Sequence, residues 1–344
     1  MKLLLATDAW FPQVNGVVRT LARVRDELTA SGFTVEIVAP DGFRSIPCPT
    51  YPEIRLALMP GRAIAAQIDA FAPDAIHIAT EGPIGQATRR ICRKRGLAFT
   101  TSFHTRFPEY VEARFGLPVG LCYSLLRRFH NAASAVMVAT PSLRRELEQR
   151  GFRNVVAWSR GVDTALFRPQ RGALDNLERP VFAYVGRVAV EKNIGAFLAL
   201  DLPGTKVVIG DGPQRAALER AFPATRFLGT LQGEALARVF ADADVFVFPS
   251  RTDTFGLVLL EALACGVPVA AYPVTGPIDV VNDPAIAVLD EDLGRAARAA
   301  LALSRHACRR FALGYSWSHT ARQFAGNLAL LRAVTVPEIH ARFG

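Results

Sequence analysis

The chain has few cysteines and no long apolar run, and each scarcity excludes a class of protein. Its five cysteines form no CxxC pair and have no neighbouring histidine cluster, which argues against a disulfide framework and a zinc site and fits a reducing compartment. The apolar start of the chain ends at Asp8, too early for the core of a signal peptide, and glycine and proline interrupt the uncharged stretch 262–278. We therefore predict neither a secreted nor a membrane-spanning protein.

Two glycine-rich nucleotide-binding motifs are also missing. Neither GxGxxG, the dinucleotide fingerprint, nor GxxxxGK, the P-loop, occurs in the sequence, which argues against NAD-dependent enzymes and ATPases. Aromatic residues are absent from the basic cluster 86–95, although nucleic-acid-binding proteins commonly interleave them with arginine to stack on bases. We therefore predict no nucleic-acid partner.

The net charge of +9 lies almost entirely in the first half of the chain. Residues 1–170 hold 22 Lys or Arg against 14 Asp or Glu, whereas residues 171–344 hold 18 against 17. Such a field favours phosphate-rich partners, including nucleotides and anionic lipid surfaces. The alternative is that the arginines only solvate exposed helices.

Short apolar runs bounded by turns alternate with helical patterns along the whole chain. They lie at 2–7, 33–39, 75–79, 97–102 and 135–140, and again at 181–186, 205–209, 225–228, 244–248 and 267–271. This rhythm predicts the α/β class, with two Rossmann-like parallel-sheet domains at 1–170 and 171–344 and a terminal helical pattern, 317–334, that crosses back. Since such sheets bind ligands at the carboxyl ends of their strands, we expect a site in a cleft between the domains.

The run 249–271, PSRTDTFGLVLLEALACGVPVAA, carries the strongest signal for a ligand site. It predicts a buried strand and then a helix, with Asp253 and Thr254 where a helix cap belongs. Glu261 follows Asp253 by eight residues, about 12 Å along a helix, so two carboxylates could flank one extended ligand. The alternative is a plain cap at Asp253 and a solvated Glu261. The helix amides expected to bind phosphate oxygens are those of Phe255, Gly256 and Leu257.

Other strand ends carry residues suited to a nucleotide. Arg187 and Lys192 follow the strand at 181–186, where a planar fork and a compact charge suit a diphosphate, although Lys192 could instead pair with Glu191. His104 follows the run 97–102 and would project toward the same cleft. Turns that let a ligand approach the backbone are expected at Asn15, Gly16, Gly186, Gly210, Asp211 and Gly212.

Together these motifs resemble the retaining, GT-B-fold glycosyltransferases of family 4 over nearly the whole chain. The E-x7-E element of that family is similar to Asp253 to Glu261, with Asp in place of the first Glu, and its R-x4-K pair is similar to Arg187 and Lys192. Its glycine loop and cleft histidine are similar to Asn15, Gly16 and His104. The segments DAWFPQVNGVVRT, TSFHTRFPEY and SRTDTFGLVLLEALACGVP look closest to the branch that glycosylates diacylglycerol and related lipids.

The resemblance implies a donor site graded from Asp253 at the sugar, through the amides of residues 255–257 at the diphosphate, to Glu261 at the ribose. It implies a donor of the GDP-mannose or UDP-glucose, glucuronate or sulfoquinovose type and a metal-independent reaction without a cofactor. It also implies a cytoplasmic enzyme held at the inner face of the membrane by its basic first domain, with 121–129 as an interfacial segment. The alternatives are a nucleotide-sugar epimerase, a transferase acting on a polysaccharide or soluble acceptor, and a non-catalytic sensor. The basic residues expected at the membrane are Arg89, Arg90, Arg93, Lys94, Arg95, Arg127 and Arg128.

Overall fold

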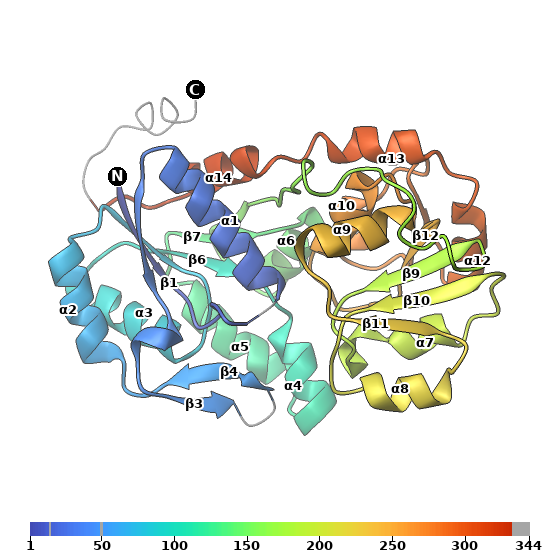
Figure 1. The fold of residues 1–344 in the computed structure, drawn as a ribbon. Helices are drawn as coiled ribbons and strands as arrows, with labels where there is room; N and C mark the ends of the chain where they lie inside the picture. The colour runs from blue at the N-terminus through green and yellow to red at the C-terminus, as the bar shows by residue number, and fades with distance from the viewer. Residues whose placement is uncertain (14, 49–50, 332–344) are drawn as a thin grey trace. The chain divides into compact units, whose positions relative to one another are not determined.

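The computed structural model describes residues 1–13, 15–48 and 51–331, which form two compact units (Figure 1). Of the described residues, the first unit contains those up to 160 and those at 317–331, and the second contains residues 161–316. Each unit is built on a six-stranded parallel sheet with helices, which confirms the predicted α/β class with two Rossmann-like parallel-sheet units.

The first unit has the strand order β2-β1-β5-β6-β7-β8. Its four inner strands, β1, β5, β6 and β7, are short and almost wholly buried, because helices cover both faces of the parallel sheet. Leu3, Leu4 and Leu5 of β1 are fully buried, and alternate residues contribute to the cores on opposite sides of the sheet. The strands are β1 (Lys2–Ala6), β2 (Thr34–Val38), β5 (Ala75–Ile78), β6 (Thr100–Phe103), β7 (Ala135–Val138) and β8 (Val155–Ala157).

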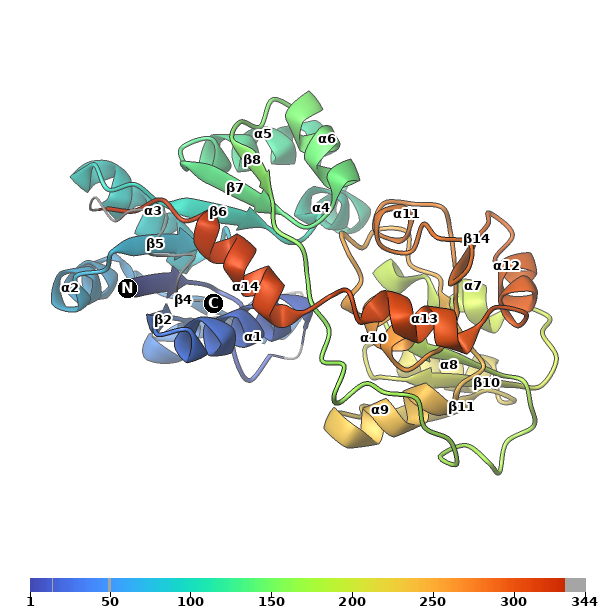
Figure 2. The ribbon, with the colours of Figure 1, turned by 90° about the horizontal axis from the view of Figure 1, so that it is seen from above.

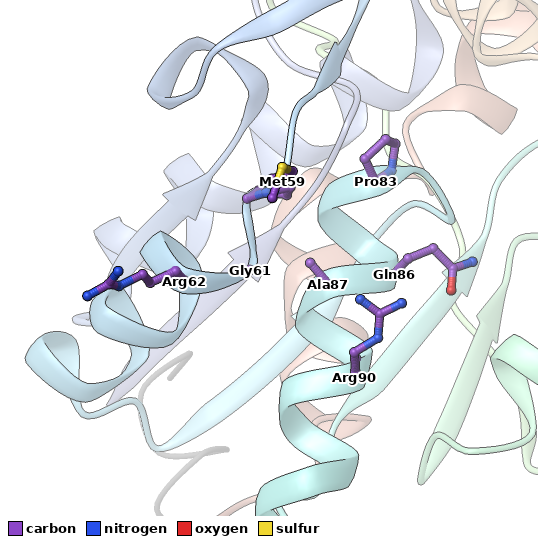
Figure 3. A pocket seen from close by; sticks show the side chains of 8 residues that line it. Met59, Gly61, Arg62, Pro83, Gln86, Ala87 and Arg90 are labelled. Carbon is purple, nitrogen blue, oxygen red and sulfur yellow. The ribbon is translucent and has the colours of Figure 1, made fainter.

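Helices cover both faces of this sheet. On one face α1 (Gly16–Ala30) packs beside α14 (Trp317–Gly326), so the end of the described chain returns to the first unit as expected (Figure 2). On the other face α2 (Gly61–Phe71) and α3 (Pro83–Arg95) lie side by side (Figure 3). The remaining helices are α4 (Phe107–Phe115), α5 (Val119–His130) and α6 (Pro141–Gln149). The final helix is shorter than predicted, and residues 332–334 of that prediction lie outside the described residues.

Several strands were not predicted from the sequence. An antiparallel hairpin of β3 (Ser45–Cys48) and β4 (Tyr51–Ala57) precedes α2, and its prolines hide the strand pattern because proline is rare inside sheets. The edge strands β8 and β14 (Ala287–Leu289) contain only three residues each, too few for a periodicity to stand out.

The second unit repeats the design with the order β11-β10-β9-β12-β13-β14. Its central strands β9 (Val181–Val185) and β12 (Val245–Phe248) are buried along their whole length. The other strands are β10 (Thr205–Ile209), β11 (Arg226–Gly229) and β13 (Val269–Ala271). The helices are α7 (Ile194–Leu198), α8 (Arg215–Ala221), α9 (Gly233–Asp242), α10 (Leu257–Ala264), α11 (Pro277–Val280), α12 (Leu293–Ala300) and α13 (Arg305–Ala312).

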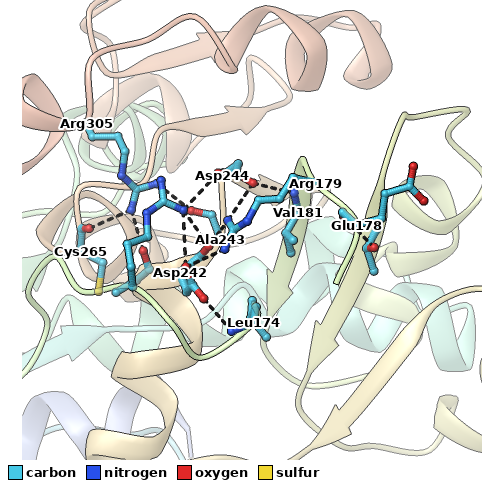
Figure 4. A network of polar contacts seen from close by, with 12 residues as sticks. Leu174, Glu178, Arg179, Val181, Asp242, Ala243, Asp244, Cys265 and Arg305 are labelled. Carbon is cyan, nitrogen blue, oxygen red and sulfur yellow. Dashed lines mark hydrogen bonds and ion pairs between the residues drawn. The ribbon is translucent and has the colours of Figure 1, made fainter. Parts of the chain in front are cut away.

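The polar segment before β9 is fixed to the second unit by two aspartates (Figure 4). Arg179 pairs with Asp242 at 2.7 Å and with Asp244 at 3.0 Å, and the Leu174 amide donates to Asp242 at 2.6 Å. Burial alone would raise the pKa of Asp242, but the hydrogen bonds from Leu174 and Arg179 bring it below its ordinary value. Both aspartates therefore remain charged and tie the entering chain to the start of the sheet.

Candidate functional site

Most of the residues predicted for the donor site lie at the carboxyl edge of the second sheet. The loops after β9, β10 and β12 carry Gly186 to Lys192, Gly210 to Gly212, and Asp253 to Leu257. Parallel strands end at one edge of their sheet, so loops far apart in the sequence meet there. Asn15, Gly16 and His104 belong to the first unit and are described separately.

The loops after β9 and β10 pack backbone against backbone. A Cβ at Gly210 would lie 1.8 Å from the carbonyl oxygen of Gly186, and one at Gly212 would lie 2.4 Å from that of Val188. The Val188 amide donates to the Asp211 carbonyl at 2.8 Å. Gly210 and Gly212 therefore permit the close approach of two loops of the protein itself. The Asp211 carboxylate accepts from the Gly212 amide and pairs with Arg215 at 3.1 Å.

Lys192 forms an ion pair with Asp253, a residue of another loop. The Lys192 ammonium lies 2.6 Å from Oδ1 of Asp253, and both side chains are only about one-fifth exposed, 22% and 19%. Oδ2 of Asp253 is buried and accepts no hydrogen bond from the described residues. The two loops are further joined by Thr252, whose hydroxyl donates to the Glu191 carbonyl at 3.3 Å. The Lys192 ammonium therefore lies beside a carboxylate whose Oδ2 can still accept a hydrogen bond.

The helix α10 begins with a glycine and has no side-chain cap. Gly256 is its N-cap residue, with φ 80°, so the expectation that Asp253 and Thr254 stand at the cap is wrong by two to three residues. Within the described residues, the amides of Gly256 and Leu257 donate to no protein acceptor. Unpaired amides at a helix start carry partial positive charge and suit phosphate oxygens. Phe255 itself is buried.

Glu261 and Arg187 flank this region. Glu261 lies on α10 and is 5% exposed, so the alternative of a solvated surface residue is wrong. Asp253 lies in the loop before the helix, and a helical spacing between the two carboxylates therefore does not apply. Arg187 is half-buried, and its carbonyl accepts the Tyr184 hydroxyl at 2.8 Å. Burial, and then the charges of Asp253 and Glu191, raise the pKa of Tyr184 well above its ordinary value, so its hydroxyl stays neutral.

Two residues that support this site were not identified from the sequence. A Cβ at Gly276, with φ 95°, would lie 2.8 Å from the Asp253 carbonyl oxygen, so only glycine lets the loop before α11 pass under Asp253. Asn193 follows Lys192 in a left-handed conformation and donates its side-chain amide to the Pro249 carbonyl at 3.1 Å. Neither contact is local in sequence, and a positive φ leaves no pattern beyond the residue type itself.

In the first unit, His104 follows β6 and contacts a buried arginine. Nη2 of Arg160 lies 3.4 Å from Nδ1 of His104. A guanidinium can only donate, so Nδ1 accepts and the proton of the neutral ring is on Nε2. Burial, followed by the charge of Arg160, holds the pKa of His104 well below its usual value. Burial lowers the pKa of Arg160 to about 9, so at neutral pH the arginine keeps its charge beside a neutral imidazole.

Asn15 and Gly16 begin α1, where the Asn15 side chain caps the helix. Its Oδ1 accepts from the amides of Val17 and Val18, both at 3.0 Å. Gly16 is the first residue of the helix, and its carbonyl accepts the Thr20 hydroxyl at 2.7 Å. Two of the amides that could face a ligand at this edge are thus already engaged by the chain itself.

The described residues contain neither a metal-binding cluster nor a helix that could span a membrane. No group of three or more His, Cys, Asp or Glu among them is arranged to hold a metal ion. In the same part of the chain, no helix combines the length and apolarity that a bilayer crossing requires.

Two family models match the chain, one on each unit. Residues 14–166 match the model described as Glycosyltransferase Family 4, and residues 179–306 match that described as Glycosyl transferases group 1. The sulfoquinovosyl transferase of Arabidopsis thaliana is 34% identical over 260 residues, which are 70% of this chain and 51% of that protein, so the chain spans about half of its length. A GDP-mannose-dependent alpha-mannosyltransferase of Mycolicibacterium smegmatis is 30% identical over 308 residues, 82% of each chain.

Solved structures share the fold. Sucrose-phosphate synthase from Thermosynechococcus elongatus has a TM-score of 0.77 at 20% identity, covering 94% of this chain and 97% of that one. The Anabaena protein HepE in complex with UDP-glucose has a TM-score of 0.71 at 15% identity, covering 94% and 98%. At these identities the likeness concerns the GT-B arrangement of the fold.

Proposed function

The chain belongs to glycosyltransferase family 4, and from that premise we propose that it transfers a hexose from a nucleotide-diphosphate sugar to an acceptor hydroxyl, with retention of the anomeric configuration. The observation that carries this proposal is the group formed by the Lys192 ammonium, the Asp253 carboxylate and the open start of α10. It offers positive charge for a diphosphate and a carboxylate oxygen for sugar hydroxyls within one small region.

The leaving diphosphate is the part of the reaction that these residues serve. As the bond to the anomeric carbon breaks, negative charge grows on the phosphate oxygens. Arg187, Lys192 and the amides of Gly256 and Leu257 stabilise that charge. They do so without a resident metal ion or cofactor. Such preorganised donors lower the barrier because they need no reorganisation when the charge develops.

The two carboxylates bind the hydroxyl groups of the donor, Asp253 those of the sugar and Glu261 those of the ribose. Asp253 uses Oδ1 to hold Lys192 and leaves Oδ2 for a sugar hydroxyl, while Glu261 accepts from the ribose hydroxyls. In the first unit, His104 donates from Nε2 to the sugar, since its Nδ1 already accepts from Arg160. The acceptor attacks from the face that the diphosphate leaves, and a diphosphate oxygen takes its proton, so no separate base is needed.

The substrates are proposed from the relatives. Their names specify GDP-mannose as a donor and sulfoquinovosyl as a transferred group, and one relative acts on phosphatidylinositol dimannoside. We therefore assign a GDP-mannose-type or UDP-glucose-, glucuronate- or sulfoquinovose-type donor and a membrane lipid such as diacylglycerol or a glycolipid as acceptor. The enzyme would work at the inner face of the membrane, where its basic first half meets anionic lipid.

Radiolabelled transfer tests this function. The purified chain is incubated with a panel of UDP- and GDP-sugars and extracted membrane lipids, and the products are separated by thin-layer chromatography. Label in a lipid product with one donor is the expected result. Label found only in a soluble or polysaccharide product would show that the acceptor is not a lipid. If the chain incubated with donor alone formed an epimerised nucleotide sugar, it would be an epimerase and not a transferase.

A further inference from the structure

The first unit has a groove between α2 and α3 that the proposed chemistry does not use. Its volume is about 500 Å³, and its apolar lining includes Met59, Pro83 and Ala87 (Figure 3). Arg62 extends from α2 on one side, and Arg90 lies on α3 on the other. The groove thus combines an apolar floor with one arginine on each of its two helices.

Large apolar side chains stand in solvent at the same end of α2. Met59 is 95% exposed, in a left-handed conformation with φ 47°, and Leu58 is 48% exposed. Ile46 is 47% exposed and pairs with Leu56 across the hairpin, so it shares a face with Leu58. Exposed apolar clusters of this kind mark contact surfaces rather than ordinary solvent-facing positions.

The two arginines that line the groove face solvent. Arg62 and Arg90 are exposed and make no ion pair with the described residues. Arg93 continues the basic face of α3. Arg89 of the same helix is turned instead toward α5, where its guanidinium donates to the carbonyls of Arg128 and Phe129. An anionic surface laid over α2 and α3 would supply a counter-charge to Arg62 and Arg90.

The groove opens at the edge of the first sheet that also carries His104. The helix α3 follows β5, so its start at Pro83 lies at the carboxyl end of that strand. His104 follows β6, the neighbour of β5, at the same edge. A lipid headgroup at the start of α3 would therefore lie at the same edge of the first sheet as His104.

We propose that the α2–α3 groove docks the protein onto an anionic bilayer, with Met59 entering the acyl region and Arg62 and Arg90 binding lipid phosphates. The inference rests on the proposed lipid acceptor and adds the face that meets the membrane. A bilayer fits better than a free phosphate because the two arginines lie on separate helices flanking apolar residues. The exposed Leu121 and Leu125 of α5 form a separate apolar surface, which the experiment includes as a competitor.

Vesicle flotation measures the docking directly. The full chain is mixed with vesicles of phosphatidylcholine alone, or of phosphatidylcholine and phosphatidylglycerol in equal parts. We expect binding to the mixed vesicles that high salt weakens. Arg62→Gln with Arg90→Gln should lower the partition coefficient about 25-fold, since each arginine near such a surface contributes about 1 kcal/mol. Met59→Ser should lower it on the order of tenfold.

A matched double variant removes the same charge from the second unit. Arg238→Gln with Arg310→Gln takes two exposed arginines from α9 and α13 and should bind vesicles as the unaltered chain does. Equal loss in both double variants, or loss in Leu121→Ser with Leu125→Ser but none in Met59→Ser, would overturn the groove as the docking face. So would an unaltered chain that ignores phosphatidylglycerol.

A second readout keeps this proposal distinct from the function itself. The groove variants should still transfer sugar to an acceptor lipid dispersed in detergent, because none of the altered residues belongs to the donor site. Transfer in detergent without selective vesicle binding would reject the docking face and leave the glycosyltransferase proposal standing. Vesicle binding without any transfer would reject the enzyme function and leave the docking face standing.

Discussion

The two units share one architecture, but α1 and α3 of the first unit and α10 of the second begin differently. In the first unit, Asn15 caps α1, and the Asp8 carboxylate accepts from the amides of Ile84 and Gly85 at the start of α3, at 2.9 and 3.3 Å. In the second, α10 starts at Gly256, which offers no side chain to its amides. A Rossmann-like helix start that its own chain has filled cannot take a phosphate without rearrangement, so the comparison assigns the diphosphate to α10.

The net charge of each half of the chain does not follow the position of the cations proposed to bind the diphosphate. The first half of the chain carries the excess of arginine, yet the cations placed for the diphosphate, Arg187 and Lys192, lie in the half that is nearly neutral. A diffuse basic face attracts a surface, whereas a diphosphate needs a few donors at fixed positions. In the proposed function, the first unit therefore attracts the membrane and the second binds the donor.

Loss of Lys192 should produce the largest effect. Lys192→Ala removes a cation from the diphosphate and leaves Asp253 without its partner, so we expect kcat/KM to fall about 10²- to 10³-fold, as for other groups that stabilise transition-state charge. Lys192→Arg should recover part of that loss. Lys94→Ala, on the exposed face of α3, serves as the control and should leave donor affinity by calorimetry unchanged. Normal turnover in Lys192→Ala would remove the donor site from this edge of the sheet.

A side chain that accepts from the amides at the start of α10 should weaken donor binding, because those amides are then no longer open to a phosphate. Asparagine tolerates the left-handed φ of 80° at residue 256, and its carboxamide places an acceptor oxygen beside the amides of the helix start. Gly256→Asn should weaken donor binding about tenfold. Gly256→Ala adds the same Cβ near Leu259 and Phe248 without a cap.

The two variants at residue 256 separate capping from crowding. Asparagine should be the more thermally stable of the pair, by about 1 kcal/mol, and the weaker donor binder. If alanine and asparagine weaken binding equally, the loss comes from the added Cβ, and the open helix start does not hold the diphosphate.

The strands and the order of the loops could be predicted from the sequence because they depend on local patterns. The apolar runs at 2–7 and 181–186 became β1 and β9 with an end shifted by one residue. The hairpin β3–β4 could not be predicted this way, since its pairing depends on register between residues on both sides of a turn.

The sequence identified residues of the candidate site, but it did not identify the contacts between them. Lys192 and Asp253 were both singled out, but the sequence suggested only the neighbouring Glu191 as an ion-pair partner for Lys192, and the observed pair spans 61 residues. Arg160 went unnoticed because its contact with His104 spans 56 residues and depends on how β6 and the chain after β8 come together. Long-range polar contacts of this kind follow from the packed fold, and a linear pattern carries no trace of them.

The smallest expected effect concerns acid stability, which should also distinguish the units. His77 lies inside the first unit between the hydroxyls of Thr100 and Ser102, at 2.9 and 2.7 Å, and burial lowers its pKa from 6.5 to about 3. Below pH 6.5 the unfolded chain therefore binds a proton that the folded chain excludes, so stability is lost as pH falls toward 3. The depressed pKa of His104 acts in the same direction.

Tryptophan fluorescence isolates this effect, because all three tryptophans, Trp10, Trp158 and Trp317, belong to the first unit. Urea unfolding followed by that signal should give a free energy of unfolding that falls by about 1 kcal/mol for His77 alone between pH 6.5 and 5.5. His77→Asn cannot titrate, so its slope should be shallower by that amount, even if it is less stable at pH 7. An unchanged slope in His77→Asn would mean that the buried imidazole is not what makes the first unit sensitive to acid.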